Sequence, residues 1–222
     1  MIVGDGETAE LAYEYFTYDS PHDVVAFSVE REFAKKDELF GLPVVPFEEM
    51  ERLYPPGEYQ GFVAISYTQL NRVRRRLYRA TKEKGYECIS YISSRAFVWR
   101  NVEIGENCFI LENNVLQYSV RLGNNVILWS GNHVGHQSVI NDNVFVSSHV
   151  VISGYCEIGE NSFLGVNSCI ADKRKVARDC LIGMGAVVNK DTEEGKVYRG
   201  SPAKPSSVDS FTIFGVKSKD AA

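Results

Sequence analysis

The strongest constraint in this sequence is a six-residue repeat of aliphatic residues between positions 98 and 188. The sixteen positions of this register are Val98, Ile104, Ile110, Leu116, Leu122, Leu128, Val134, Ile140, Val146, Ile152, Ile158, Leu164, Ile170, Val176, Ile182 and Val188. With roughly a third of residues aliphatic in ordinary globular proteins, sixteen chance matches in one register have a probability on the order of 10⁻⁸. The repeat therefore reflects a repeating structure.

A period of six fits neither an amphipathic helix nor an ordinary strand. It indicates short extended segments that turn at fixed intervals, which is a solenoid. The residue two positions before each aliphatic is usually small or slender, as at Cys108, Ser138 and Ser162, and glycine often follows the aliphatic. Similar four-residue segments also begin at positions 104, 122, 140 and 158, which indicates a coil of 18 residues. The pattern resembles the hexapeptide repeat of left-handed parallel β-helices, which are three-sided prisms, and the left hand is implied by that resemblance.

The chain divides into three regions by pattern. Residues 1–90 are expected to form a small Rossmann-like α/β domain, residues 91–190 a left-handed parallel β-helix, and residues 191–222 a short tail. In the first region, strands are expected at 1–3, 24–29, 61–66 and 88–92. Helices are expected after the glycine turn through about residue 16, at 47–53 after the segment 41–46, and at 71–84.

Two segments carry further expectations. Five arginines, at positions 72, 74, 75, 76 and 79, fall on the predicted helix 71–84. We expect them to form a solvated helix face, with contact to phosphate as the alternative. In the tail, Phe211, Ile213 and Phe214 are expected to pack on the molecular surface or on a neighbouring subunit.

A glycine turn near the amino terminus is a candidate phosphate site. Gly4 and Gly6 separate the first strand from the first helix, and such a turn directs helix amide groups at an anion. Thr8 lies just after this turn, and Ser28 lies in the second strand. Glu30 follows that strand at about the distance where a dinucleotide fold holds a ribose. Because the motif lacks its third glycine, a purely structural βα turn is the alternative.

Composition narrows the function classes. A formal net charge of −5 gives no sign of the basic face that nucleic-acid binding requires. No stretch approaches about 18 uninterrupted apolar residues and no secretion signal is recognisable, so we expect a cytoplasmic protein without a membrane span. The five cysteines form no CxxC motif. Cys108, Cys156 and Cys180 fall in the small inward column, which favours free structural thiols over redox or metal-binding roles.

The histidines identify a candidate base, because histidine is the usual general base near neutral pH. Three of the four, His133, His136 and His149, lie within 17 residues. His136 stands two positions after an inward aliphatic and so on the outer wall of the prism, one coil from Gly154 and one from Tyr118. Beside a bare glycine backbone about 4.8 Å away, an extended ligand has room to lie along the wall. The spacing of the histidines differs from that of zinc-binding β-helical carbonic anhydrases, so no metal site is expected.

The whole chain resembles the sugar acyltransferases of the PglD/NeuD type. The resemblance rests on the glycine turn at 4–6, the stretch 131–138 around His136, the segments 153–159 and 163–168, and the segment 200–204. It implies a homotrimer that uses acetyl-CoA and a nucleotide-linked amino sugar, with His136 as the general base. The implied acetyl-CoA contacts are Gly154 and Val166, with Met184 and His149 as further candidates. The cosubstrate's phosphates need cations, for which Lys190, Arg199 and Lys204 are candidates, with solvated surface charge as the alternative. The implied nucleotide-sugar contacts are Gly4, Gly6, Thr8 and Ser28.

The sequence departs from the family pattern near the base. Gln137 follows it where the family commonly has an acidic residue, so the imidazole has to be oriented from elsewhere. The candidates are Asn132, Asp142 and a neighbouring subunit. Trp129 stands where some relatives have asparagine near the acceptor amine, and His133 is a further supporting candidate.

Three functions are compatible with the sequence. The favoured one is an acetyl-CoA-dependent N-acetyltransferase acting on a nucleotide-linked amino sugar, expected to be a 4-amino-4,6-dideoxyhexose, for surface glycans such as O-antigen. The alternatives are an O-acetyltransferase of sialic acid or another glycan hydroxyl, and a non-catalytic β-helix protein that binds sugar nucleotides. Thr8 replaces a histidine common in the family, and Ser28 stands where acidic residues often read the base. The nucleotide base is therefore not defined.

Overall fold

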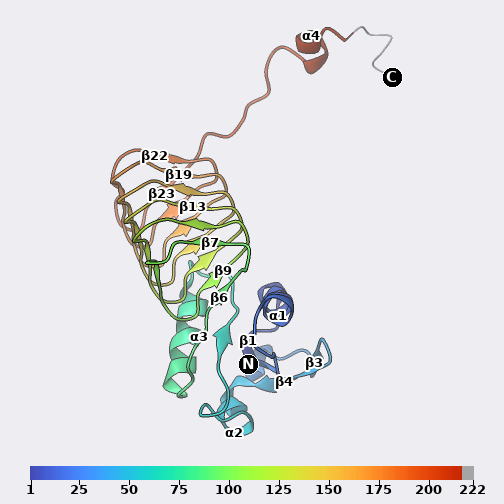
Figure 1. The fold of residues 1–222 in the computed structure, drawn as a ribbon. Helices are drawn as coiled ribbons and strands as arrows, with labels where there is room; N and C mark the ends of the chain where they lie inside the picture. Colours follow the sequence, from blue (N-terminus) through green and yellow to red (C-terminus); the bar gives the residue numbers. More distant parts are fainter. Residues whose placement is uncertain (217–222) are drawn as a thin grey trace.

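The computed structural model describes residues 1–216, which form a small α/β domain and an elongated three-sided prism (Figure 1). The amino-terminal domain lies beside the first coils of the prism, and the carboxyl-terminal segment leaves the opposite end (Figure 1). The last six residues of the predicted tail lie outside the described range. Within that range, no helix has the length and apolar character needed to cross a membrane.

The amino-terminal domain is built on a five-stranded sheet of order β3-β4-β2-β1-β5. Its strands are β1 (Ile2–Val3), β2 (Phe27–Val29), β3 (Glu38–Leu39), β4 (Leu42–Pro46) and β5 (Phe62–Val63). The β3–β4 pair is antiparallel and the other pairs are parallel. The helices are α1 (Glu7–Asp19), α2 (Met50–Leu53) and α3 (Arg72–Glu83), with 3-10 turns at Arg31–Phe33 and Phe47–Glu49. The predicted α/β alternation is confirmed.

The prism has one parallel sheet on each side, of six, five and seven strands. Sheet I consists of β7 (Phe97–Val98), β10 (Val115–Leu116), β13 (His133–Val134), β16 (Val151–Ile152), β19 (Cys169–Ile170) and β22 (Val187–Val188). Sheet II consists of β8 (Glu103–Ile104), β11 (Arg121–Leu122), β14 (Val139–Ile140), β17 (Glu157–Ile158) and β20 (Lys175–Val176). Sheet III consists of β6 (Tyr91–Ile92), β9 (Phe109–Ile110), β12 (Ile127–Leu128), β15 (Phe145–Val146), β18 (Phe163–Leu164), β21 (Leu181–Ile182) and β23 (Val197–Tyr198).

The prism interior is the aliphatic column that the repeat predicts. Of its sixteen positions, all are buried except Val98 and Ile104, which are half-buried in the first coil. Strands pair with those one coil away at the predicted 18-residue offset, as Leu116 does with Val134. The second inward column is tight, and small side chains such as Cys108 fill it.

The corners of the prism turn through residues in the left-handed backbone conformation. Positive φ angles recur every six residues from Asn107 to Gly185. Asparagine and glycine adopt this conformation at low cost, which explains why asparagine recurs along one corner. The asparagine side chains of that corner also bond to one another: Asn107 Nδ2 donates to Asn125 Oδ1 at 2.9 Å, and Asn125 Nδ2 donates to Asn143 Oδ1 at 2.8 Å.

Helix α3 attaches the amino-terminal domain to this corner, between sheets II and III. Arg74 is fully buried at the contact. Its Nη2 donates to the carbonyl oxygens of Asn125, Asn143 and Val144 at 3.2, 3.0 and 3.3 Å. These backbone carbonyls replace water around the guanidinium, so α3 joins two neighbouring coils to the domain that carries it.

The predicted solvated arginine face is therefore wrong at Arg74, and two other arginines of the helix also bind the prism. Arg72 pairs with Asp179 at 2.7 Å, and Arg75 pairs with Glu160 at 3.4 Å. Burial lowers the pKa of Arg74 to about 9, which leaves it charged at neutral pH. The arginine run is chiefly an interface between the two parts of the chain.

The two ends of the prism depart from the repeat. Ile92 falls on the six-residue register but is exposed, because β6 lies in the incomplete first coil. At the other end, β23 adds to β21 with Val197 opposite Leu181, so the prism continues past residue 190 with a shorter coil. Helix α4 (Ser210–Phe214) lies away from the prism, with its large apolar side chains exposed (Figure 1). The expected packing of the tail on its own chain is wrong; packing on a neighbouring subunit stays a prediction.

Candidate functional site

His136 lies on the corner between sheets I and II, on the outer wall of the prism, where the repeat places it. It follows β13 and precedes β14, and its side chain is exposed. The imidazole lies directly over Gly154, one coil further along. A Cβ added at Gly154 would come within 2.6 Å of His136 Cε1 and 2.9 Å of Nε2. The bare Cα of Gly154 is therefore what allows the ring to lie against the wall.

Three contacts hold His136 on this corner. Its backbone N–H donates to Gln117 Oε1 at 3.0 Å, and its carbonyl oxygen accepts from the Tyr155 N–H at 2.9 Å. The Tyr155 ring packs against the imidazole with the centroids 5.1 Å apart and the planes at 82°. Among residues 1–216 no side chain hydrogen-bonds to the imidazole, which leaves its nitrogens to a ligand.

Asn132, which was predicted to orient the imidazole, forms hydrogen bonds with the prism backbone instead. Its side chain is buried, its Oδ1 accepts from the Val150 N–H at 2.7 Å, and its Nδ2 donates to the Trp129 carbonyl oxygen. These bonds fasten the corner between sheets III and I, so the amide is directed away from the corner that carries His136. Gln137 directly follows His136, has a left-handed backbone conformation and is exposed.

The other two supporting candidates also lie apart from His136. Trp129 is half-buried beside the amino-terminal domain, with its ring 6.5 Å from that of Phe145. His133 lies on β13, between Val115 and Val151 on the outer face of sheet I. Neither contacts the imidazole of the candidate base within one chain.

Three of the predicted acetyl-CoA contacts lie together on the corner between sheets III and I. Met184 is 75% exposed and Val166 is 41% exposed, so both offer apolar surface to a ligand. The His149 ring covers Gly131, because a Cβ there would come within 2.6 Å of its Cε1 and Nδ1. Lys190 is exposed and lies two coils beyond Gly154, in the same outer column as His136.

Sheet I separates these two corners and presents an apolar outer face. Its outward side chains are those of Phe97, Val115, His133, Val151, Cys169 and Val187. Phe97, Val151 and Val187 are 51%, 44% and 72% exposed. A single chain therefore does not bring the candidate base together with Val166, Met184 and His149.

The four predicted nucleotide-sugar contacts, in contrast, line one cavity. Gly4, Gly6, Thr8 and Ser28 surround a volume of about 700 Å³ at the carboxyl ends of β1, β2 and β5. Gly4 has a φ of +126°, and a Cβ there would lie 2.8 Å from the Ala64 carbonyl oxygen, so this position requires glycine. The Oγ of Ser28 is buried without a hydrogen-bond partner in the described residues. A ligand can satisfy that hydroxyl.

An ion pair joins two sides of this cavity. Arg76 of α3 donates from Nη1 and Nη2 to the carboxylate of Glu30 at 2.6 and 2.8 Å, and it holds the Glu30 pKa below its usual range. Phe33, 54% exposed, lines the same cavity. The sequence indicated Glu30 but not Arg76, because a run of arginines does not show which of them faces a cavity.

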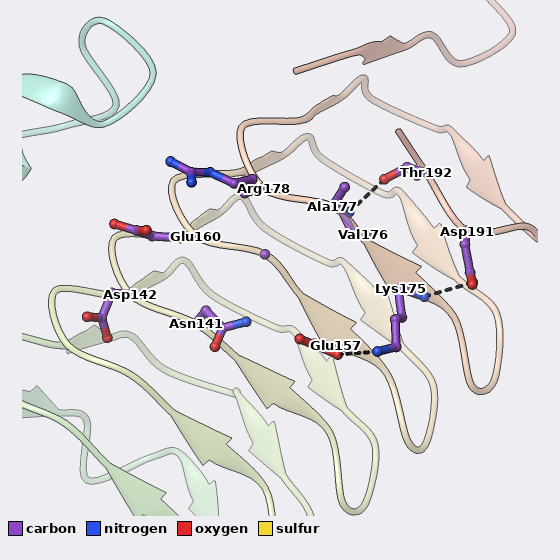
Figure 2. A pocket seen from close by; sticks show the side chains of 11 residues that line it. Asn141, Asp142, Glu157, Glu160, Lys175, Val176, Ala177, Arg178, Asp191 and Thr192 are labelled. Carbon is purple, nitrogen blue, oxygen red and sulfur yellow. Dashed lines mark hydrogen bonds and ion pairs between the residues drawn. The ribbon is translucent and has the colours of Figure 1, made fainter. Parts of the chain in front are cut away.

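A second hollow of about 620 Å³ lies on sheet II and is lined by charged side chains (Figure 2). Lys175 Nζ pairs with Glu157 at 2.9 Å, and the Lys175 N–H donates to Asp191 at 3.0 Å (Figure 2). The Ala177 N–H donates to Thr192 at 2.8 Å. These polar groups form hydrogen bonds and ion pairs with one another, and the predicted site residues do not line this hollow. We therefore assign no ligand to this hollow.

The sequence also raised the cysteines and metal-ligating side chains as candidates. The five cysteines, all within the described part of the chain, are free. Burial raises the pKa of Cys108 to about 11, as expected of a thiol in the prism interior. Over residues 1–216, no three or more His, Cys, Asp or Glu side chains are grouped so as to hold a metal ion.

The chain thus joins a six-residue-repeat β-helix, with a histidine exposed over a glycine, to an α/β domain with a glycine-lined cavity. The family model of the bacterial transferase hexapeptide (six repeats) matches residues 119–154. This segment contains His136 and ends at Gly154. The match confirms the repeat that the sequence predicts.

Solved structures of sugar N-acetyltransferases share the fold of the whole chain. One is a histidine-to-asparagine variant of perosamine N-acetyltransferase from Caulobacter crescentus, in complex with CoA and GDP-perosamine; it is 24% identical, with a TM-score of 0.82 over 91% of this chain and 94% of that chain. Another is the acetyltransferase domain of PglB from Neisseria gonorrhoeae, 24% identical, with a TM-score of 0.80 over 92% and 97%. The predicted Rossmann-like domain and left-handed β-helix are thereby confirmed, and so is the family resemblance at the level of the fold.

Proposed function

We propose that this protein is an acetyl-CoA-dependent N-acetyltransferase acting on a nucleotide-linked amino sugar. The observation that carries the proposal is the His136 imidazole, exposed on the prism wall over the bare backbone of Gly154. The shared fold supports it, since similar structures are complexes with CoA and GDP-perosamine and with acetyl coenzyme A. The cavity at Gly4 and Ser28 supports a nucleotide site.

In the proposed reaction, His136 accepts a proton as the sugar amine attacks the thioester carbonyl carbon. The new C–N bond forms, the C–S bond breaks, and the imidazolium returns the proton to the departing CoA thiolate. The N–H of Gly154 forms no backbone hydrogen bond within the described residues, and we assign it to the developing oxyanion. Because the thioester is already activated, no acyl-enzyme is required.

We infer that the functional unit is a homotrimer in which neighbouring copies complete the acetyl-CoA channel. The base lies at one edge of the apolar sheet I face, and Val166, Met184 and His149 lie at the other edge. Packing that face against a neighbour covers its exposed side chains and lets corners from different copies meet. Lys190, in the same outer column as the base, supplies a cation for the phosphates of the cosubstrate.

For the acceptor, we propose a 4-amino-4,6-dideoxyhexose linked to a nucleoside diphosphate, used in the cytoplasm for surface-glycan synthesis such as that of O-antigen. The diphosphate is assigned to the turn of Gly4 and Gly6, which opens onto the amino terminus of the 13-residue helix α1. Thr8, in the first turn of that helix, and the unpartnered Ser28 hydroxyl supply further polar contacts.

The direct test is acetyl transfer to defined sugars. The protein is incubated with acetyl-CoA and with GDP-, UDP- and dTDP-linked 4-amino-4,6-dideoxyhexoses, GDP-perosamine included, and released CoA is measured with a thiol reagent. We expect one nucleotide class to release CoA and to give a product heavier by one acetyl group and stable in mild base. His136→Asn should lower kcat by about 10²–10⁴-fold, whereas His22→Asn, in the loop after α1, should not.

Three results would contradict the proposal or one of its parts. Release of no CoA with any sugar of the panel would argue against this activity. A product lost in mild base would be an ester and would assign O-acetyl transfer instead. If His136→Asn keeps full activity while acetylation proceeds, another residue is the base.

A further inference from the structure

The side chain that contacts the exposed imidazole of His136 is that of Tyr155. The two rings meet edge to face, 5.1 Å apart at 82°. Aromatic rings favour this edge-to-face geometry, so the contact holds the two rings in a preferred relative orientation. Tyr155 directly follows Gly154, so one two-residue corner provides both the surface under the imidazole and the ring at its edge.

We propose that Tyr155 is a positioning residue, which holds His136 in the rotamer that lies over Gly154. The inference rests on the proposed function of His136 as the base. An acidic neighbour would orient an imidazole by a hydrogen bond, but Gln137 follows His136 here and Asn132 is engaged elsewhere. The contact with the Tyr155 ring orients the imidazole in place of such a hydrogen bond.

Tyr155 is itself fixed by the coils on both sides. Its N–H donates to the His136 carbonyl oxygen at 2.9 Å, and the Lys173 N–H donates to the Gly154 carbonyl oxygen at 2.9 Å. Lys173 Nζ lies over the Tyr155 ring, 5.9 Å from its centroid. The ammonium, the phenol ring and the imidazole therefore lie on three consecutive coils. A ring held in this way restricts a neighbour that solvent alone would leave free to rotate.

The contact is made by the ring and not by the hydroxyl. Over residues 1–216, the Tyr155 hydroxyl forms no hydrogen bond with His136. Phenylalanine should therefore replace Tyr155 without loss of position, whereas leucine should not. Tyr118 offers a matched control, because it is an exposed tyrosine one coil on the other side of His136 whose ring makes no aromatic contact with the imidazole.

The kinetic test compares Tyr155→Phe with Tyr155→Leu. We expect Tyr155→Leu to lower kcat by about 10-fold to 10²-fold, because a displaced base loses the geometry of proton transfer. The KM values for acetyl-CoA and for the sugar should stay within about twofold of wild type, since the proposed role concerns the base and not binding. Tyr155→Phe should keep kcat within about twofold. Equal kcat losses in both variants, or none in Tyr155→Leu, would overturn the proposal.

A spectroscopic test needs no activity. In protein labelled with ¹³C at histidine Cε1, the His136 signal, assigned by its loss in His136→Asn, should be shifted by the Tyr155 ring. Tyr155→Leu should move this signal, while Tyr155→Phe and Tyr118→Leu should leave it in place. A signal unmoved by Tyr155→Leu, or moved equally by Tyr118→Leu, overturns the proposal. A signal that depends on Tyr155 in a protein inactive with every sugar supports the contact and refutes the proposed activity.

Discussion

Among single residues, the glycines of the prism differ in what a methyl group would meet. At Gly154 an added Cβ would meet the His136 ring at 2.6 Å. At Gly135 it would meet backbone, with the Gly154 nitrogen and the Ser153 carbonyl carbon both 2.6 Å away. A side chain can rotate away from a methyl group, but the backbone of the adjacent coil is held by its strand-to-strand hydrogen bonds. Alanine at Gly154 should therefore affect activity, whereas alanine at Gly135 should affect stability.

Gly154→Ala should lower kcat by about 10²-fold while the melting temperature stays close to that of wild type, because the imidazole moves and the coil does not. Gly135→Ala should instead destabilise the prism by about 1–3 kcal/mol through overpacking. Steady-state kinetics and thermal unfolding of the two variants measure both effects. A fully active Gly154→Ala enzyme would show that catalysis does not require the imidazole over Gly154.

Among the elements, helix α3 links the cavity at Gly4 and Ser28 to the prism. It carries Val73, Arg76 and Leu77 of the cavity lining and the buried Arg74 of the interface. Moving the helix would therefore disturb both. The contact of Arg74 with the prism therefore helps to set the distance between the cavity and the prism wall.

Arg74→Met should destabilise the protein by about 3 kcal/mol, since three carbonyl oxygens each lose a hydrogen bond. It should also weaken the binding of nucleoside diphosphates, which calorimetric titration with GDP and UDP measures. Arg79→Met, on the exposed side of the same helix, is the control and should change neither. Unchanged stability in Arg74→Met would show that the buried guanidinium does not hold the two parts together.

Helix α1 is joined to the first coil through Asp19. Its carboxylate accepts from the Tyr91 hydroxyl at 2.5 Å and from the Ser94 N–H at 3.0 Å. Hydrogen bonds from Ser94 and Tyr91 lower the Asp19 pKa from 3.8 to about 2. The stabilisation from this group is therefore present above about pH 4 and is lost as the pH falls through 2.

Asp19→Asn should lower the melting temperature by roughly 2–4 °C at pH 7, which corresponds to about 1 kcal/mol for a partly exposed carboxylate. The difference from wild type should shrink as the pH falls from 4 to 2. Paired thermal scans across this range measure it. A difference that stays constant between pH 7 and pH 2 would mean that the charge of Asp19 is not what joins the helix to the coil.

For the whole molecule, the faces of the prism have separate roles. The amino-terminal domain covers part of sheet III, where it packs on Phe109, Ile127 and Phe145. Sheet II carries charged side chains on its outer face. Sheet I has neither cover nor charge, and its exposed apolar column is the surface through which we expect the trimer to form.

Val151→Glu should convert the trimer to smaller species and abolish acetyl transfer, because it places a charge in the middle of that face. Val139→Glu, on sheet II, should stay trimeric and active. Light scattering after size-exclusion chromatography reports the mass of each variant. A Val151→Glu protein that remains a trimer would exclude sheet I as the interface.

The parts of the structure that the sequence predicts are those set by the six-residue repeat, which recurs on every coil. Counting in sixes places Ile140 in the core and His136 over Gly154, and the structure confirms both. The same count does not reveal Arg74, because its partners are backbone carbonyls that any sequence provides. The contact of Tyr155 with His136 was not predicted for another reason. The repeat fixes the column in which Tyr155 lies, but the contact depends on the rotamers of both side chains.

The corner residues with positive φ angles recur every six residues, so the prism has a constant repeat distance along its axis. One complete turn of 18 residues advances the chain by about 4.8 Å along the axis and returns each side chain to the same face. Adding or removing whole turns between the amino-terminal cavity and His136 would move the imidazole up or down without rotating it. A six-residue change would move it to a different side. The height of the imidazole above the amino-terminal cavity can therefore change only in steps of one complete turn.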